Sequence, residues 1–365
     1  MFRGLPISTL PRLVVRPRRL PDRPLHVLIC IADHFEPQRG NASASLARER
    51  VGRWLTEYPR LAERYADSRG RMPQHTFFYP AEEYEPEHLD ALATLNEREL
   101  GDVEVHLHHD RDTAESLREK ILDFTGQLRH VHGLLELDEL GRASYGFIHG
   151  NWALDNSRPD GRWCGVNNEL SVLLETGCYA DFTMPCAPAG AGCQTRTINS
   201  IYYATDDPAR PKSHDLGAAA KAEVHSPPDS LLMIQGPLAL DWRWRKWGLI
   251  PRIENGDLTQ RRPPTIERLW NWIAAGVGVV GCDHWRFVKL HTHGALEPNT
   301  GMLLGEPMRG FHAALARFAA GNDWFHYYYV TAREMAAAVH WLERRPATAA
   351  PGEALEAFGG HVWRC

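Results

Sequence analysis

The chain has 365 residues, 43% of them hydrophobic and 24% charged, and its formal net charge is −5 at pH 7. This composition is ordinary for a globular protein, and the length suffices for one large domain. The acidic balance gives no electrostatic basis for binding nucleic acid or an anionic membrane, so we expect neither as a partner. No stretch approaches the roughly 18–20 apolar residues of a membrane span, so we expect no membrane-spanning segment.

The cysteines and the N-terminal sequence indicate in which cellular compartment the protein is expected. Seven cysteines are present, no two of them in C-x-x-C spacing, which disfavours a structural zinc knuckle. An odd number, with Cys30 inside an apolar run, fits a reducing compartment better than a disulfide framework. The first residues are basic and interrupted by prolines, without the apolar core of a signal peptide. We therefore expect a cytoplasmic protein.

Short apolar runs that resemble buried strands alternate along the chain with amphipathic runs typical of helices. The predicted strands lie in 26–37, 75–80, 102–110, 144–152, 178–185, 231–238, 285–294 and 326–332. The predicted helices lie in 44–66, 86–99, 113–137, 167–177, 264–276 and 333–345, with a break expected at Pro59.

Seven or eight strands alternating with helices predict an α/β fold, specifically a distorted (β/α) barrel of mostly parallel strands. A doubly wound open sheet is the alternative architecture. We expect a basic, proline-rich extension over 1–24, the barrel over 25–345 and a C-terminal tail over 346–365. Two long insertions, about 185–230 and 236–265, are expected at the loop face of the barrel.

Residues suited to metal or proton chemistry gather where the predicted strands end. In a parallel barrel the carboxyl ends of the strands form the active-site face. Four strands deliver histidines or carboxylates to that face, together with polar neighbours: Asp33, His34 and Glu36; His106, His108, His109, Asp110 and Asp112; His149, Asn151 and Trp152; His291 and His293.

The third strand predicts a metal site. Its two-residue pleat places Glu104, His106 and His108 on one face, so the two histidines can share an ion. With His34 from the first strand, they form a set typical of a catalytic divalent metal; we expect Zn²⁺, with other divalent ions as the alternative. Such a metal lowers the pKa of bound water to about 7. A hydrolase also needs a base and an acid, for which Asp33 and either His291 or His293 are the candidates.

The order of the segments resembles a NodB-type polysaccharide deacetylase (carbohydrate esterase family four). The similar segments are HVLICIADHFEP, HTFFYP, DVEVHLHHDRD, NNELSVLLETGCYADFTMP, FVKLHTHG and YYYVTAREMAAAV, and they span most of residues 25–345. Each motif is degenerate, so the T-F-F strand and the order of the segments carry the resemblance.

The resemblance implies roles for individual residues. Asp33 matches the family's base aspartate, and His34 stands where a metal-binding aspartate is expected. His108 matches the first metal histidine, Asp112 occupies the place of the second, and His106 could supply the missing imidazole. His291 matches the histidine that protonates the leaving group, with His293 as the near alternative. Glu36, His149, Asn151 and Trp152 are the expected substrate-facing residues.

The resemblance implies a metal-dependent hydrolase that deacetylates an N- or O-acetylated polysaccharide or glycan precursor. An amidohydrolase-like or glycoside-hydrolase-like reaction on the same barrel is an alternative, because a fold does not fix a function. A non-catalytic relative that only binds glycan is another. The Trp- and Arg-rich segment 239–249 could stack on sugar rings, line a single-stranded nucleic-acid path, or pack on the barrel.

Overall fold

The computed structural model describes residue 13 and residues 24–187 and 193–345 of the chain. The expected extension over 1–24 lies almost wholly outside the described residues, and the expected tail over 346–365 lies entirely outside them. Within the described ranges, no helix combines the length and the apolar character that crossing a bilayer requires.

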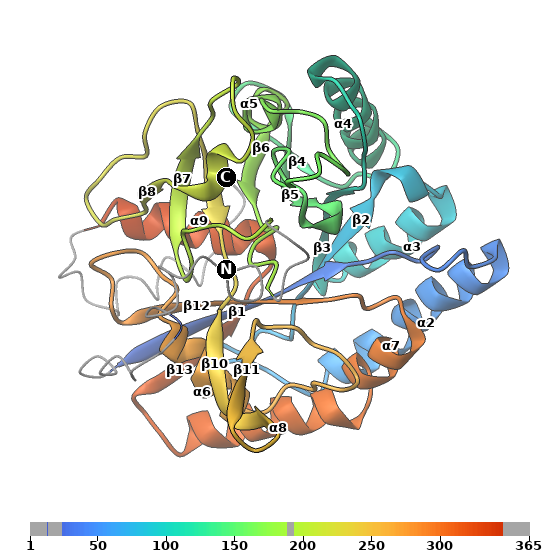
Figure 1. Ribbon diagram of the computed structural model, residues 1–365. Coiled ribbons are helices and arrows are strands. Elements are labelled where there is room, and N and C mark those ends of the chain that lie inside the picture. The colour runs from blue at the N-terminus through green and yellow to red at the C-terminus, as the bar shows by residue number, and fades with distance from the viewer. Residues whose placement is uncertain (1–12, 14–23, 188–192, 346–365) are drawn as a thin grey trace.

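An eleven-stranded, mostly parallel sheet forms the centre of the molecule (Figure 1). Its main path runs β12-β1-β2-β3-β5-β6-β9-β7-β8, and the pairings of β4, β7 and β8 are antiparallel. The strands are β1 (Leu25–His34), β2 (His75–Pro80), β3 (Gly101–Leu107), β4 (Glu136–Leu137), β5 (Ala143–His149), β6 (Cys178–Asp181), β7 (Ile201–Thr205), β8 (Ala218–Ala219), β9 (Ser230–Ile234), β12 (Trp285–Thr292) and β13 (Phe325–Tyr329).

Strand β1 has three partners. Along one edge it pairs with β12 over nearly its whole length, from His26 to Asp33. Its other edge is shared, because β13 pairs with Leu25–Ile29 and β2 pairs with Ala32–His34. All three pairings are parallel, so the carboxyl ends of these strands point the same way.

The sheet separates two apolar layers. Val27, Ile29 and Phe35 face a layer built largely from helices, whereas Leu28 and Cys30 face the opposite layer, where α9 packs. This alternation is the period-2 pleat of a strand buried on both faces. The helices are α2 (Ala44–Ala62), α3 (Pro86–Glu97), α4 (Ala114–His130), α5 (Glu169–Glu175), α6 (Ile266–Ala275), α7 (Glu297–Leu303), α8 (Glu306–Ala320) and α9 (Ala332–Glu343), with short 3-10 turns η2 (Ala81–Glu83), η3 (Gly150–Trp152) and η4 (Ser213–Asp215).

The fold prediction is confirmed at the level of class. The structure shows a mixed α/β fold with a mostly parallel central sheet and helices. Its strand ladder does not close among the described residues, since β12 and β8 are the two ends of the path. The structure thus shows an open ladder where we expected a barrel.

The two expected insertions carry secondary structure. The first contains β7 and β8, which extend the main sheet: β7 pairs antiparallel with β9, and β8 pairs antiparallel with β7. The second contains a separate antiparallel hairpin of β10 (Ala239–Lys246) and β11 (Ile250–Glu254). The break expected at Pro59 is wrong, because α2 continues through this residue to Ala62.

Candidate active site

The carboxyl ends of β1, β3 and β12 bring six predicted residues together: His34, Glu36, His106, His108, His291 and His293. The strand pleat explains the orientation of two of them. His106 lies in β3 opposite to the buried Val105 and Leu107, which face the helices. His34 ends β1 on the same inner side, and its ring centroid lies 4.9 Å from that of His106.

Glu36 lies at the centre of this group. Its Oε1 is 3.3 Å from Nε2 of His108 and 3.7 Å from Nε2 of His106. Its Oε2 is 2.7 Å from Nδ1 of His293 and is also paired with the guanidinium of Arg39. The Glu36 side chain is only 4% exposed, so solvent does little to screen these contacts.

The protons of two histidine rings can be placed from their partners. Nδ1 of His106 lies 2.8 Å from the carbonyl oxygen of Ile148, which can only accept, so Nδ1 carries the proton. Nδ1 of His108 lies 2.5 Å from a carboxylate oxygen of Glu82 and is protonated for the same reason. In the neutral rings both Nε2 atoms therefore present lone pairs toward Glu36. Nε2 of His106 is buried and has no hydrogen-bond partner.

Three acceptor atoms, Oε1 of Glu36 and Nε2 of His106 and His108, thus face one another. A cation between them would relieve the repulsion between their lone pairs. Ligands held about 2.0–2.1 Å from a tetrahedral ion are about 3.3 Å apart, close to the separations at Glu36. The hydrogen bonds on the far side of both rings are of the kind that orients metal-binding histidines. Glu36, His106 and His108 could therefore hold a metal ion. We call these three residues the first metal group.

A proton on His108 is the competing occupant. Burial by itself would lower the pKa of His108, but the hydrogen bond and charge of Glu82 raise it overall. Burial would raise the pKa of Glu36, yet the neighbouring imidazoles of His106 and His293, the latter within hydrogen-bond distance, hold it well below its ordinary range. The carboxylate is therefore ionised, and a metal ion would displace a proton from His108 on binding.

His34 and His291 are buried neutral imidazoles beside this group. Burial, together with the neighbouring His293 and His106, holds the pKa of His34 well below its ordinary value. Burial and the charge of Lys289 act in the same way on His291. The ring centroid of His34 lies 4.9 Å from that of His293 and 6.4 Å from that of His291. Both rings therefore stay neutral at pH 7 and can accept hydrogen bonds, but their lowered pKa values make them weak bases.

His108 is held in place by the chain on its other side. Its ring packs so closely on Gly150 that a Cβ atom at this glycine would lie 2.2 Å from His108 Cδ2. Any larger residue at position 150 would therefore displace the imidazole.

The structure places Asp33 outside the first metal group. The pleat of β1 turns it to the face opposite His34, where its Oδ2 lies 2.9 Å from Nε2 of His75. Its Oδ1 accepts a hydrogen bond from the backbone N–H of Gly294, at 2.6 Å. Asp33 is thereby fully engaged beneath the turn that follows β12. Its contacts hold the turn that leads from His293 and do not bring it to the first metal group, where the sequence suggested a base.

Gly294→Ala is expected to destabilise the protein by about 1–3 kcal/mol and to lower its activity, because overpacking forces the chain to shift. The new Cβ would lie 2.0 Å from Oδ2 of Asp33, which would break the Asp33–Gly294 hydrogen bond and move His293. Urea unfolding measures the stability. Gly310→Ala in α8 is the control, since nothing lies within 4 Å of its Cβ position, and it should stabilise the helix by about 1 kcal/mol. A Gly294→Ala variant as stable and active as the parent would contradict this account.

The other predicted site residues lie elsewhere. Asp112 binds the Lys120 ammonium at 2.7 Å and lies 3.1 Å from Nδ1 of His109, so it does not reach the first metal group. His149 belongs to a second buried group with His109. Asn151 is exposed, and Trp152 packs partly against the core. None of these four residues supplies a ligand to the first metal group.

Sequence reasoning missed Glu82 and Arg39. Glu82 lies in η2, directly after β2, so the rule that the carboxyl ends of parallel strands share one edge would have identified it. Arg39 lies in a turn after β1, three residues from Glu36, and had no signal of its own. Glu36 was expected to face substrate, but the structure places it among the candidate ligands.

No protein-family model matches the chain, and no curated protein compared with it matches either. The resemblance to NodB-type deacetylases therefore stays a prediction made from the sequence. The chemistry of the site is the basis for the function that follows.

Proposed function

We propose that this protein is a metal-dependent hydrolase that removes acetyl groups from an N- or O-acetylated polysaccharide or glycan precursor. The observation that carries the proposal is the convergence of three lone pairs from Glu36, His106 and His108 on one point. A two-histidine, one-glutamate set with a free fourth position is a known ligand arrangement of catalytic Zn²⁺. The His108 side chain is 29% exposed, so the site is accessible from solvent on that side.

A divalent ion held by these residues would supply an activated water and would polarise the acyl oxygen of the substrate. The protein's own side chains would orient the water and donate a proton to the leaving group. His34, neutral and buried, can accept a hydrogen bond from the attacking water and so orient it. His293, held by Glu36 and Arg39, is suited to protonate the leaving group. Asp33 fixes the turn that carries His293.

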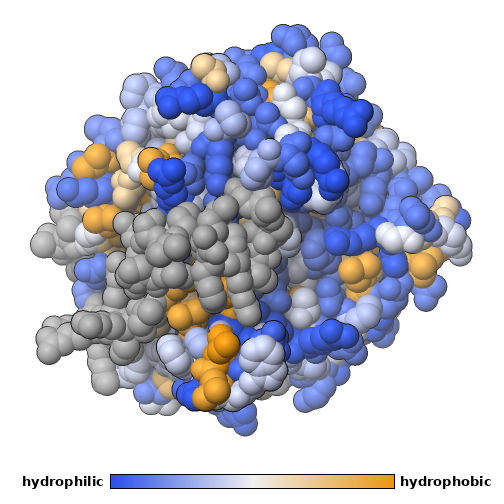
Figure 2. Space-filling view, viewed as in Figure 1, coloured by the Kyte–Doolittle hydropathy of each residue, from blue (hydrophilic) through white to orange (hydrophobic). Residues whose placement is uncertain are grey.

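The hairpin β10–β11 supports a glycan as substrate. Three of its tryptophans are exposed: Trp242 (51%), Trp244 (39%) and Trp247 (77%). Figure 2 shows an apolar patch over this hairpin, low on the visible face, where Leu249 and Ile250 are also exposed. Flat aromatic surfaces of this kind stack on sugar rings, and the neighbouring arginines would pair with acidic groups of a polysaccharide.

The proposal includes the distorted barrel implied by the resemblance. Lys289 of β12 supports it, since its ammonium donates to the carbonyl oxygens of Phe182 and Met184, in the segment that starts at the end of β6. This contact joins two strands that are five positions apart along the sheet path, which requires strong curvature of the sheet.

Acetate release tests the proposal. The protein purified with Zn²⁺ is incubated with a panel of N- and O-acetylated oligosaccharides, and with nitrophenyl glycosides as a control for glycosidase activity. We expect acetate from at least one oligosaccharide, its loss on treatment with a metal chelator, and its return when Zn²⁺ is added back. Release of free sugar or ammonia without acetate would replace deacetylation by another hydrolysis. Metal binding without any turnover would indicate a glycan-binding protein.

A further inference from the structure

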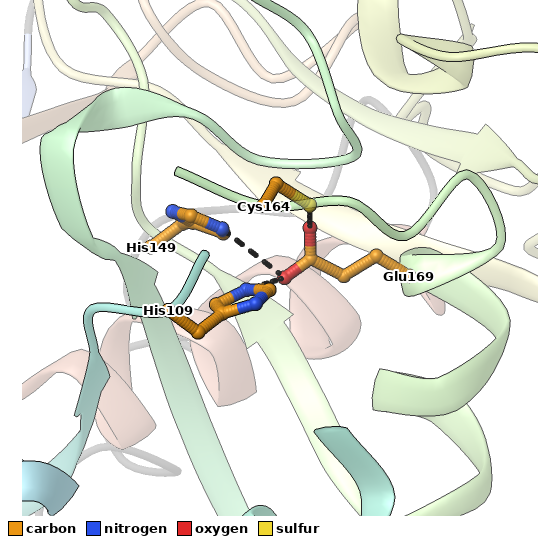
Figure 3. A group of neighbouring side chains, drawn as sticks. All are labelled: His109, His149, Cys164 and Glu169. Atoms are coloured by element: carbon orange, nitrogen blue, oxygen red, sulfur yellow. Dashed lines mark hydrogen bonds and ion pairs between the residues drawn. The ribbon is translucent and has the colours of Figure 1, made fainter. Parts of the chain in front are cut away.

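A second group of four side chains lies close to the first but shares no residue with it. It consists of His109, His149, Cys164 and Glu169, which point toward one another in Figure 3. His109 follows β3, His149 ends β5, Cys164 lies in the loop that follows, and Glu169 is the first residue of α5. All four residues are buried, and the side chains of the two histidines and Glu169 are fully so.

Glu169 connects the other three members. Its Oε1 lies 3.2 Å from Nε2 of His109 and 3.5 Å from Nε2 of His149. Its Oε2 lies 3.3 Å from Sγ of Cys164. Ligands of a tetrahedral Zn²⁺ ion, at about 2.0–2.3 Å from the metal, are separated by similar distances, roughly 3.3–3.6 Å.

The proton on His149 cannot satisfy Glu169. Nδ1 of His149 lies 2.6 Å from the carbonyl oxygen of Gly150, which can only accept a hydrogen bond, so the proton of the neutral ring is on Nδ1. Nε2 therefore presents a lone pair to the Glu169 carboxylate. This nitrogen is buried and has no hydrogen-bond partner. Two acceptors facing each other in a dry interior are unfavourable unless a cation lies between them.

His109 lies between two carboxylates and can donate to only one of them. Its Nε2 is within hydrogen-bond distance of Glu169, at 3.2 Å, whereas its Nδ1 faces the carboxylate of Asp112 at 3.1 Å, at an angle that makes no hydrogen bond. A neutral imidazole carries one proton, so one of its nitrogens faces a carboxylate with a lone pair. If Nδ1 carries the proton, Asp112 is the outer carboxylate that orients a metal-binding histidine.

The sulfur of Cys164 has two donors and two acceptors around it: as a thiol it would donate to Oε2 of Glu169 or to the carbonyl oxygen of Val166, and it accepts from two backbone amides. Sγ accepts a hydrogen bond from the backbone N–H of Asn156 at 3.2 Å and another from that of Val166 at 3.4 Å. Hydrogen bonds from backbone amides stabilise negative charge on sulfur and are common around metal-bound thiolates. Metal binding would displace the thiol proton, which burial otherwise retains.

We propose that His109, His149, Cys164 and Glu169 form a second metal site, a closed four-ligand Zn²⁺ site with a structural role. Four buried protein ligands leave no open position, which is typical of structural zinc, whereas the first metal group has three ligands and solvent access. The second site would fix the segment between β5 and α5, which is irregular and has left-handed backbone at Asn151, Trp152, Asp155 and Asn156.

Metal content and Co²⁺ spectroscopy test this inference separately from the proposed function. The protein is produced in minimal medium containing either Zn²⁺ or Co²⁺, and metal per chain is measured. We expect two equivalents in the parent protein and one in Cys164→Ala. The Co²⁺ form should show a near-ultraviolet thiolate charge-transfer band, which the first metal group cannot produce because it contains no sulfur. The band should persist in His106→Ala and vanish in Cys164→Ala.

Cys178→Ala is the matched control, because Cys178 is also a buried free thiol but belongs to neither group. It should retain the band and both metal equivalents. A parent protein that binds Co²⁺ without the band would overturn the inference, as would a band that survives in Cys164→Ala. The spectrum of the parent protein decides the question even if the Cys164→Ala variant does not fold. A protein that shows the thiolate band but releases no acetate would contradict only the proposed function and would leave the second metal site supported.

Discussion

His106→Ala is expected to lower the rate of hydrolysis at least about 10³-fold and to remove one equivalent of metal. Truncation deletes one of three ligands, while Glu36 and His108 alone hold an ion weakly. A metal that polarises the acyl group and activates water contributes several kcal/mol to the transition state, and about 4 kcal/mol corresponds to 10³ in rate. Acetate release under saturating substrate and metal analysis of the same sample provide the measurement.

Two further variants test whether the three residues of the first metal group are the ligands. Glu82→Gln keeps all three ligands but weakens the partner of His108 Nδ1, so we expect a 10–100-fold loss of metal affinity, roughly the effect of outer-shell changes elsewhere. Asp112→Asn, at a position that the sequence suggested as a ligand, should leave the metal of the first group in place. Full activity in His106→Ala, or metal loss from the first group in Asp112→Asn, would show that the ligand set is wrong.

Arg268→Ala is expected to lower the free energy of unfolding by about 3 kcal/mol, within the range for breaking one side of a buried ion pair. Arg268 donates to both carboxylate oxygens of Glu254, each at 2.9 Å, and the Glu254 side chain is fully buried. Arg262 also contacts Glu254 at 2.9 Å, so the remaining charge is partly compensated. Urea unfolding at pH 7 measures the loss.

The control for this prediction is Arg53→Ala. Arg53 pairs with Glu57 on the exposed surface of α2, and its loss should cost less than about 0.5 kcal/mol. A cost for Arg268→Ala no greater than that for Arg53→Ala would mean that the buried pair contributes nothing to stability.

The ion pair of Glu254 also predicts a pH dependence. Burial alone would raise the pKa of Glu254, but Arg268 and Arg262 lower it below its ordinary value of 4.5. The unfolded chain therefore binds the proton more readily, and the contribution is complete above pH 4.5 and is lost as the pH falls through the lowered value. The difference in stability between the parent and Arg268→Ala should shrink in this acidic range.

Much of the fold could be predicted from the sequence because its strands are short apolar runs. β2 was predicted with both ends correct, and β1 and β3 to within a few residues. The pleat of β3 correctly placed Glu104 and His106 on one face, both fully buried. α4 ends seven residues earlier than expected, at His130, because Gly133 follows in a left-handed conformation that ends the helix, a signal that the sequence prediction overlooked.

The candidate site could be predicted only in part. Adjacent residues of a strand point to opposite faces, so the pleat that places His34 in the site turns Asp33 away from it. The prediction followed the family resemblance for Asp33 and did not apply this rule. The second group depends on loop closure between positions far apart in the chain, from His109 to Glu169. No local spacing encodes such contacts, so sequence reasoning assigned no role to Cys164.

The close packing of Gly150 under His108 has an evolutionary consequence. Position 150 tolerates no side chain while the imidazole of His108 lies against it, so the residue at 108 restricts which residue can stand at 150. A lineage that kept the metal would be expected to retain both residues. In a lineage that lost His108, position 150 could accept other amino acids, and both positions would then vary. Glycine at 150 would thus mark which descendants of such a chain still need their metal.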